Sequence, residues 1–138
     1  MMNSKKTILL VEDDMVDVMT VKRAIRDVSI PNVLAVAGNG EEALEYLKNS
    51  ENEKPGLILL DLNMPRMNGI EFLSIIKQNE ELKMIPVIVL TTSNQERDIV
   101  ESFKLSVAGY MLKPVDYKEF INVMKNIDSY WSYSIMPN

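Results

Sequence analysis

The chain alternates between short apolar runs and longer amphipathic stretches, and few folds accommodate that alternation. Each apolar run is rich in Ile, Leu and Val and lacks the regular polar positions of a strand with one face in water. The runs are Thr7–Val11, Val33–Ala37, Leu57–Leu60, Pro86–Thr91 and Gly109–Leu112. Continuous apolar runs of this length indicate strands that are covered on both faces, as in a parallel sheet.

The stretches after these runs carry apolar residues at helical spacing. These residues are Val18, Val21, Ile25 and Val28, then Ala43, Leu44 and Leu47, then Phe72, Leu73 and Ile76, then Ile99 and Phe103, and last Tyr117, Phe120, Ile121, Met124 and Ile127. Asn39 is expected to cap the second helix, because acidic residues follow it in the first turn. Five strands alternating with five helices predict a doubly wound α/β domain with helices on both faces of the sheet.

The length of 138 residues suits one domain with its own core. We expect this domain to span residues 5–128, followed by an aromatic tail at residues 129–138. The chain has no cysteine and no histidine, which excludes disulfides, thiolate or imidazole metal sites and a histidine general base. Any chemistry must therefore use carboxylates, hydroxyls, lysines, backbone groups and bound ions.

The net charge of −5 argues against nucleic acid as a partner. The basic pairs Lys5-Lys6 and Lys22-Arg23 are short and isolated, so we interpret them as solvated surface. Neither a signal peptide nor a run of about 20 apolar residues is present, so we expect no membrane association and a cytoplasmic location.

Polar side chains follow the ends of four predicted strands, where open parallel sheets place their functional sites. Acids follow two of these strands, a hydroxyl ends a third, and a lysine follows the last. They are Glu12-Asp13-Asp14, Asp61, Thr91 and Lys113. Asp14 alone has a simpler interpretation, as the cap of the first helix. Acids from two separate strands are harder to dismiss, because like charges crowded together are costly without a cation among them.

Without histidine or cysteine, that cation is expected to be a hard, oxygen-preferring ion such as Mg²⁺. Its ligands would be Glu12, Asp13, Asp61 and one backbone carbonyl. Such a site suits phosphoryl transfer, which depends on positioning and charge neutralisation. A carboxylate can act as the nucleophile and form an acyl phosphate, and we assign this role to Asp61. Thr91, Lys113 and the cation would hold the phosphoryl oxygens, and Lys113 could pair with Asp61 when the site is empty.

At these residues the chain resembles the receiver domains of two-component response regulators, the CheY-like family, from about Lys5 to Asp128. The most specific segment runs from Asp61 to Gly69, with the sequence DLNMPRMNG. The family pattern is an acid, two residues, Met-Pro, two residues and then commonly Asp-Gly. Gly69 matches, and Asn68 replaces the usual Asp at a position where Asn caps a helix equally well.

The resemblance implies a flavodoxin-like sheet with strand order 2-1-3-4-5 and a role for each matching residue. Glu12 and Asp13 hold the metal, Glu12 directly or through water, and the backbone carbonyl of Asn63 completes its coordination. Asp61 accepts the phosphoryl group from a histidine kinase. The remaining matches are Thr91 as the switch hydroxyl, Lys113 as the family lysine, Pro114 as a cis-proline after it, Tyr110 as the aromatic switch residue and Gly69 as a structural glycine.

By the same resemblance, phosphorylation draws the Thr91 hydroxyl toward the phosphoryl group and lets Tyr110 rotate inward. This would reshape the face formed by the fourth helix, fifth strand and fifth helix, which then contacts a downstream protein. Such a domain signals and is not a conventional enzyme, since it catalyses only its own phosphorylation and dephosphorylation. Ten residues follow the last predicted helix, so output through protein contact is expected.

The aromatic tail has two interpretations. Trp131 and its tyrosine neighbours could form a docking or dimer surface, as in the similar single-domain partners of bacteriophytochrome kinases. Alternatively, Trp131 extends the apolar stripe of the fifth helix and packs on its own domain.

Three rival functions are open at this point. A haloacid-dehalogenase-type phosphatase also uses an Asp after a strand, but it needs a second Asp where this chain has Asn63. A flavodoxin-like cofactor binder is disfavoured because Glu12-Asp13-Asp14 would repel the cofactor's phosphate. A pseudo-receiver that binds partners without phosphate ranks below the switch, because the acidic set is complete.

Overall fold

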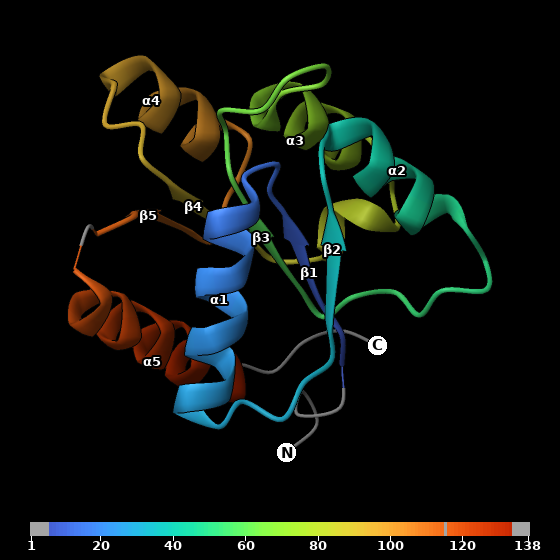
Figure 1. Cartoon of the computed structure of the whole chain (residues 1–138). Helices are drawn as coiled ribbons and strands as arrows, with labels where there is room; N and C mark the ends of the chain where they lie inside the picture. The colour runs from blue at the N-terminus through green and yellow to red at the C-terminus, as the bar shows by residue number, and fades with distance from the viewer. Residues whose placement is uncertain (1–5, 115, 134–138) are drawn as a thin grey trace.

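The computed structural model describes residues 6–114 and 116–133, and these form one parallel sheet flanked by helices (Figure 1). The strand order is β2-β1-β3-β4-β5, which confirms the predicted doubly wound, flavodoxin-like topology. The strands are β1 (Ile8–Val11), β2 (Leu34–Ala37), β3 (Leu57–Leu60), β4 (Val87–Thr91) and β5 (Gly109–Leu112). Each lies within its predicted apolar run, and any difference is one residue at the N-terminal end.

Helices follow every strand, as the apolar spacing predicts. They are α1 (Met15–Val28), α2 (Gly40–Lys48), α3 (Gly69–Lys77), α4 (Glu96–Lys104) and α5 (Tyr117–Tyr133), with a short 3-10 turn, η2 (Leu82–Met84), before β4. Asn39 caps α2 as expected, because its side chain accepts a hydrogen bond from the amide of Glu42 at 3.0 Å. Asp14 likewise caps α1 by accepting from the amide of Val16 at 2.8 Å.

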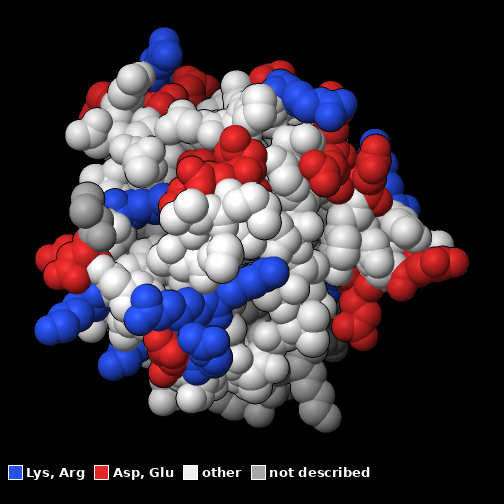
Figure 2. All heavy atoms as spheres, in the orientation of Figure 1, with Lys and Arg blue, Asp and Glu red and all other residues white. Residues whose placement is uncertain are grey.

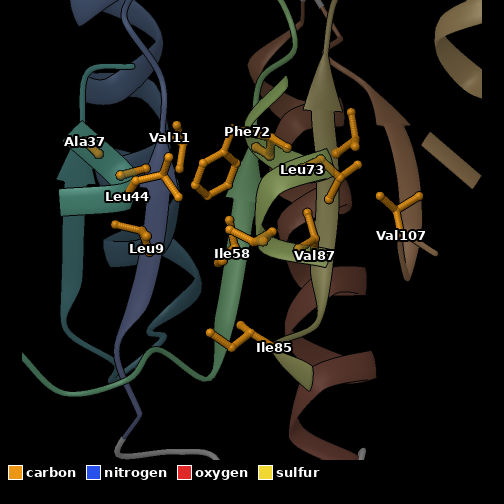
Figure 3. Packing of buried hydrophobic residues seen from close by; sticks show 14 of the residues in the cluster. Leu9, Val11, Ala37, Leu44, Ile58, Phe72, Leu73, Ile85, Val87 and Val107 are labelled. Atoms are coloured by element: carbon orange, nitrogen blue, oxygen red, sulfur yellow. The ribbon is translucent and has the colours of Figure 1, made fainter. Parts of the chain in front are cut away.

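The strands divide their side chains between two cores, one on each face of the sheet. Ile8 and Leu10 of β1 pack with α1 and α5, whereas Leu9 and Val11 pack with α2 and α3. Figure 3 shows the second core, in which Phe72 of α3 lies against the sheet. The central strands β1, β3 and β4 are buried at every position, so their sequences are apolar at consecutive positions rather than at alternate ones. The edge strands β2 and β5 are less covered than the sequence predicts, since Val36 is 41% and Leu112 is 50% exposed.

Helix α5 is longer than predicted, because it continues past Asp128 to Tyr133. Trp131 lies on its buried face and is only 1% exposed, and its indole N–H donates to the carbonyl of Gly56 at 3.1 Å. The packing interpretation of Trp131 is therefore correct, and its interpretation as an exposed docking residue is wrong. Residues 134–138 of the predicted tail lie outside the described residues.

Parallel pairing places the carboxyl ends of all five strands at the same edge of the sheet, the upper edge in Figure 1. The predicted functional residues follow these ends, so the fold itself determines where they gather. In the part of the chain that the structure describes, no helix combines the length and apolarity that crossing a membrane requires.

Candidate functional site

Three carboxylates converge where β1 and β3 end. Glu12, Asp13 and Asp61 each offer a carboxylate oxygen, and these oxygens lie within 4.8 Å of one another. The register explains the convergence, since Val11 pairs with Leu60 and the next residues are Glu12 and Asp61. Figure 2 shows acidic side chains gathered over the upper end of α1 on this face.

Burial makes this acidic cluster electrostatically unfavourable on its own. Glu12 is 3% exposed and Asp61 is 6% exposed, while Asp13 reaches solvent. Burial, with the charge of Asp61 as a further cause, raises the pKa of Glu12 to about 7 although the Lys113 hydrogen bond works against the rise. A divalent cation bound among these oxygens would relieve the repulsion, and an all-oxygen donor set suits a hard ion. The residues present therefore fit a divalent metal.

Lys113 reaches the cluster from the loop after β5. Its Nζ donates to Glu12 Oε1 and to Asp17 Oδ2, the latter at 2.9 Å, and lies 3.7 Å from Asp61 Oδ2. Burial lowers the pKa of Lys113. The hydrogen bonds to Asp17 and Glu12 and the charge of Asp61 raise it by more, so the pKa lies above its usual value. The lysine therefore stays charged among three acids.

Asp17 was missed by the sequence interpretation, which considered only residues at strand ends. It lies in the first turn of α1, four residues after Asp13. Asp13 precedes the N-cap Asp14 and lies outside the helix, so no helical spacing linked Asp17 to the acids at the strand end. The predicted Lys113–Asp61 ion pair is present, but Lys113 lies closer to Glu12 and Asp17.

Thr91 ends β4 beside Asp61 and is fully buried. Its Oγ1 donates to Asp61 Oδ1 at 2.7 Å and accepts a hydrogen bond from the amide of Ser93 at 3.3 Å. The amide of Asn63 approaches the same carboxylate oxygen at 3.4 Å. One oxygen of Asp61 is thus bound by a hydroxyl, while the other faces the Lys113 ammonium.

Tyr110 on β5 is connected to the acidic site through Ser93 and Thr91. Its hydroxyl donates to the carbonyl of Ser93 at 2.8 Å, and its ring packs against the α2/α3 core. Burial raises the pKa of its phenol. Ser93 is therefore a shared partner of Thr91 and Tyr110, a connection that the sequence interpretation did not contain.

The two residues predicted to be structural differ in outcome. A Cβ on Gly69 would lie 2.5 Å from the backbone oxygen of Asp61, so only glycine allows α3 to start so close to the Asp61 loop. The expected cis-proline is wrong, because none of the peptide bonds among residues 6–114 and 116–133 is cis and the Lys113–Pro114 bond is therefore trans. The amide of Lys113 is already fixed by the Thr91 carbonyl at 2.8 Å.

The fold and the site define a flavodoxin-like domain with a buried acidic centre suited to a divalent ion. The model of the response regulator receiver domain matches residues 8–125. The chain belongs to this family, whose members are signalling domains of two-component systems and not conventional enzymes. Its acidic site is consistent with phosphorylation, and the family match decides against the phosphatase and flavin-binding alternatives.

Two relatives that are covered over most of their own length illustrate the family. Response regulator Rcp1 of Synechocystis sp. is 41% identical over 133 residues, covering 94% of this chain and 90% of the relative. Chemotaxis protein CheY-3 of Vibrio cholerae is 34% identical over 113 residues, covering 82% of this chain and 84% of the relative.

Solved structures agree with this grouping. The phosphorylated cyanobacterial phytochrome response regulator RcpA has a TM-score of 0.90 and 35% identity, over 97% of this chain and 99% of the other. The Mn²⁺-bound form of Rcp1 has a TM-score of 0.88 and 38% identity, over 96% and 99%. The RcpA match confirms the predicted similarity to response regulators associated with phytochromes.

Proposed function

We propose that this protein accepts a phosphoryl group on Asp61 from a histidine kinase, in a reaction that depends on Mg²⁺. One observation carries the proposal: the buried Asp61 carboxylate lies between the Thr91 hydroxyl and the Lys113 ammonium, beside the acids Glu12 and Asp13. The hydroxyl, the ammonium and the acids that would hold the metal therefore surround the side chain that would receive the phosphoryl group.

The metal ligands in this proposal are Glu12, Asp13, Asp61 and the backbone carbonyl of Asn63. The bound ion would neutralise charge on the phosphoryl oxygens during transfer. The solved Mn²⁺-bound form of Rcp1 supports a divalent ion at this kind of site. We choose Mg²⁺ because carboxylate and carbonyl oxygens are its usual protein ligands.

In the transfer itself, a carboxylate oxygen of Asp61 attacks phosphorus on the kinase's phosphohistidine. The new O–P bond forms as the P–N bond breaks, and the electron pair leaves with the imidazole, which is protonated by solvent. Lys113 and Thr91 are positioned to hold phosphoryl oxygens on either side. The solved phosphorylated form of RcpA supports a phosphorylated state in this family.

The output step starts at Thr91. A phosphoryl group adds about −1.5 to −2 charges and three strong acceptors. The Thr91 hydroxyl would therefore leave the Asp61 carboxylate and donate to a phosphoryl oxygen instead. This movement alters the Thr91–Ser93–Tyr110 hydrogen bonds. Tyr110 would then take up a new position on the face formed by α4, β5 and α5.

That face is our candidate contact surface for the downstream protein. Val100, Phe103 and Leu112 are all exposed apolar side chains on α4 and β5. The alternative is a homodimer through α5 and the tail. Its exposed aromatic residues would be Tyr130 and Tyr133, because Trp131 is buried. The similarity to the phytochrome response regulator RcpA favours a phytochrome-type histidine kinase as the phosphoryl donor.

Intact-mass spectrometry after incubation with acetyl phosphate and Mg²⁺ tests the proposal. The wild type should gain the mass of one phosphoryl group, and Asp61→Asn should gain none. Unmodified wild type with native-like folding would favour the pseudo-receiver, while a phosphorylated Asp61→Asn variant would place the nucleophile elsewhere.

A further inference from the structure

The Lys113 ammonium is shared by three carboxylates, and only two belong to the set that would bind metal and phosphate. Glu12 and Asp61 are in that set, whereas Asp17 comes from α1 and lies outside it. Asp17 Oδ2 is 2.9 Å from Nζ, and Asp61 Oδ2 is 3.7 Å away. The ammonium therefore contacts both the acids of the site and the first turn of α1.

The backbone on both sides of this contact is fixed. Asp14 caps α1 and thereby sets the first turn that carries Asp17. The amide of Lys113 is bound to the carbonyl of Thr91 at 2.8 Å. The lysine can therefore change partner by rotating its side chain while its backbone stays in place. The Lys113 side chain is 11% exposed and that of Asp17 is 37% exposed, so this contact borders solvent.

We propose that Asp17 is a positioning residue that holds Lys113 in the resting state and competes with the phosphoryl group for its ammonium. This inference rests on the proposed function of Asp61. A phosphoryl group on Asp61 brings additional negative charge next to Lys113 and draws the ammonium inward. The Asp17 contact is then weakened, so it stabilises the unphosphorylated state more than the phosphorylated one. A contact that favours one state shifts the equilibrium toward it by that difference.

Asp17→Asn tests this competition, because the amide keeps the shape of the side chain and removes its charge. With acetyl phosphate and Mg²⁺, the initial rate of phosphorylation should rise about two- to fivefold, the size expected for a partly exposed ion pair. In a crystal structure of the variant, Lys113 Nζ should lie within hydrogen-bond distance of Asp61. Asp17→Glu, which keeps the charge, should return the rate to near that of the wild type.

Asp14→Asn is the matched control. It removes one negative charge from the same end of α1, Asn still caps a helix, and Asp14 is exposed. If Asp14→Asn accelerates the reaction as much as Asp17→Asn, the effect is general electrostatics and the competition is refuted. An unchanged or slower rate for Asp17→Asn, at an unchanged melting temperature, refutes it as well.

The outcome also separates this inference from the proposed function. A wild type that takes no phosphate defeats both. A wild type that is phosphorylated at Asp61, with an Asp17→Asn rate equal to its own, leaves the proposed function standing and removes only the role of Asp17.

Discussion

Glu12 and Asp61 each come directly after the last residue of a buried strand. The in-register pairing of β1 with β3 makes them neighbours, and burial then raises the pKa of Glu12 to about 7. Bringing like charges out of water together opposes folding, and the Lys113 ammonium does not fully offset this, since the pKa of Glu12 is raised despite its contact. The presence of this cluster at the sheet edge indicates that the site is maintained for binding rather than for stability.

Gly69 is the residue where this geometry is most sensitive to one added carbon. Gly69→Ala should lower the free energy of unfolding by about 1–3 kcal/mol, because the new Cβ would overlap the Asp61 carbonyl and Leu62. Urea denaturation measures the change. Gly109→Ala is the control, since a Cβ there meets its nearest neighbour at 3.8 Å, an ordinary contact. Equal stability of the two variants would contradict the steric explanation.

Among the helices, α4 has the weakest hold on the sheet. The only residue buried along its length is Ser102, whereas α3 buries four residues. A polar link compensates in part, because Ser93 Oγ donates to Asp98 Oδ2 in the first turn of α4 at 2.5 Å. Ser93 also contacts Thr91 and Tyr110, so the link joins the site to the helix. An element that is weakly packed and tied to the site is suited to move between two states.

Ser93→Ala should therefore loosen α4 without unfolding the domain. We expect amides of α4 to exchange with deuterium about fivefold faster, corresponding to the loss of roughly 1 kcal/mol from one hydrogen bond. Hydrogen-exchange mass spectrometry on the unphosphorylated protein measures this. The exposed neighbour Thr92 supplies the control as Thr92→Ala, and similar exchange in both variants would show that the Ser93 hydroxyl does not anchor α4.

Across the whole molecule, the end of α5 completes the α1/α5 core. Trp131 is buried with residues of β1, β3 and β4, and its indole binds a carbonyl 75 residues earlier in the chain. The last turns of α5 are therefore part of the domain. A dimer test by truncation after Asp128 would also remove this core residue, so substitution of the exposed Tyr130 is the cleaner test.

Trp131→Ala should lower the free energy of unfolding by about 3–5 kcal/mol, the usual cost of deleting a large buried aromatic side chain. Tyr133→Ala is the matched control, because Tyr133 is 82% exposed and a surface change there should stay within about 0.5 kcal/mol. Chemical denaturation followed by circular dichroism compares the two. A Trp131→Ala variant as stable as Tyr133→Ala would mean that the α5 end does not support the core.

The positions of the strands, the order of the helices and the acids at the strand ends follow from the sequence, because burial on both faces leaves continuous apolar runs that local inspection can find. Four features became known only from the tertiary structure. They are the contact of Lys113 with Asp17 on α1, the hydrogen bonds at Ser93, the trans bond before Pro114 and the burial of Trp131. Each depends on side chains or backbone brought together from distant segments. Spacing along one segment carries no record of such contacts, since they form only when the sheet and its helices have packed.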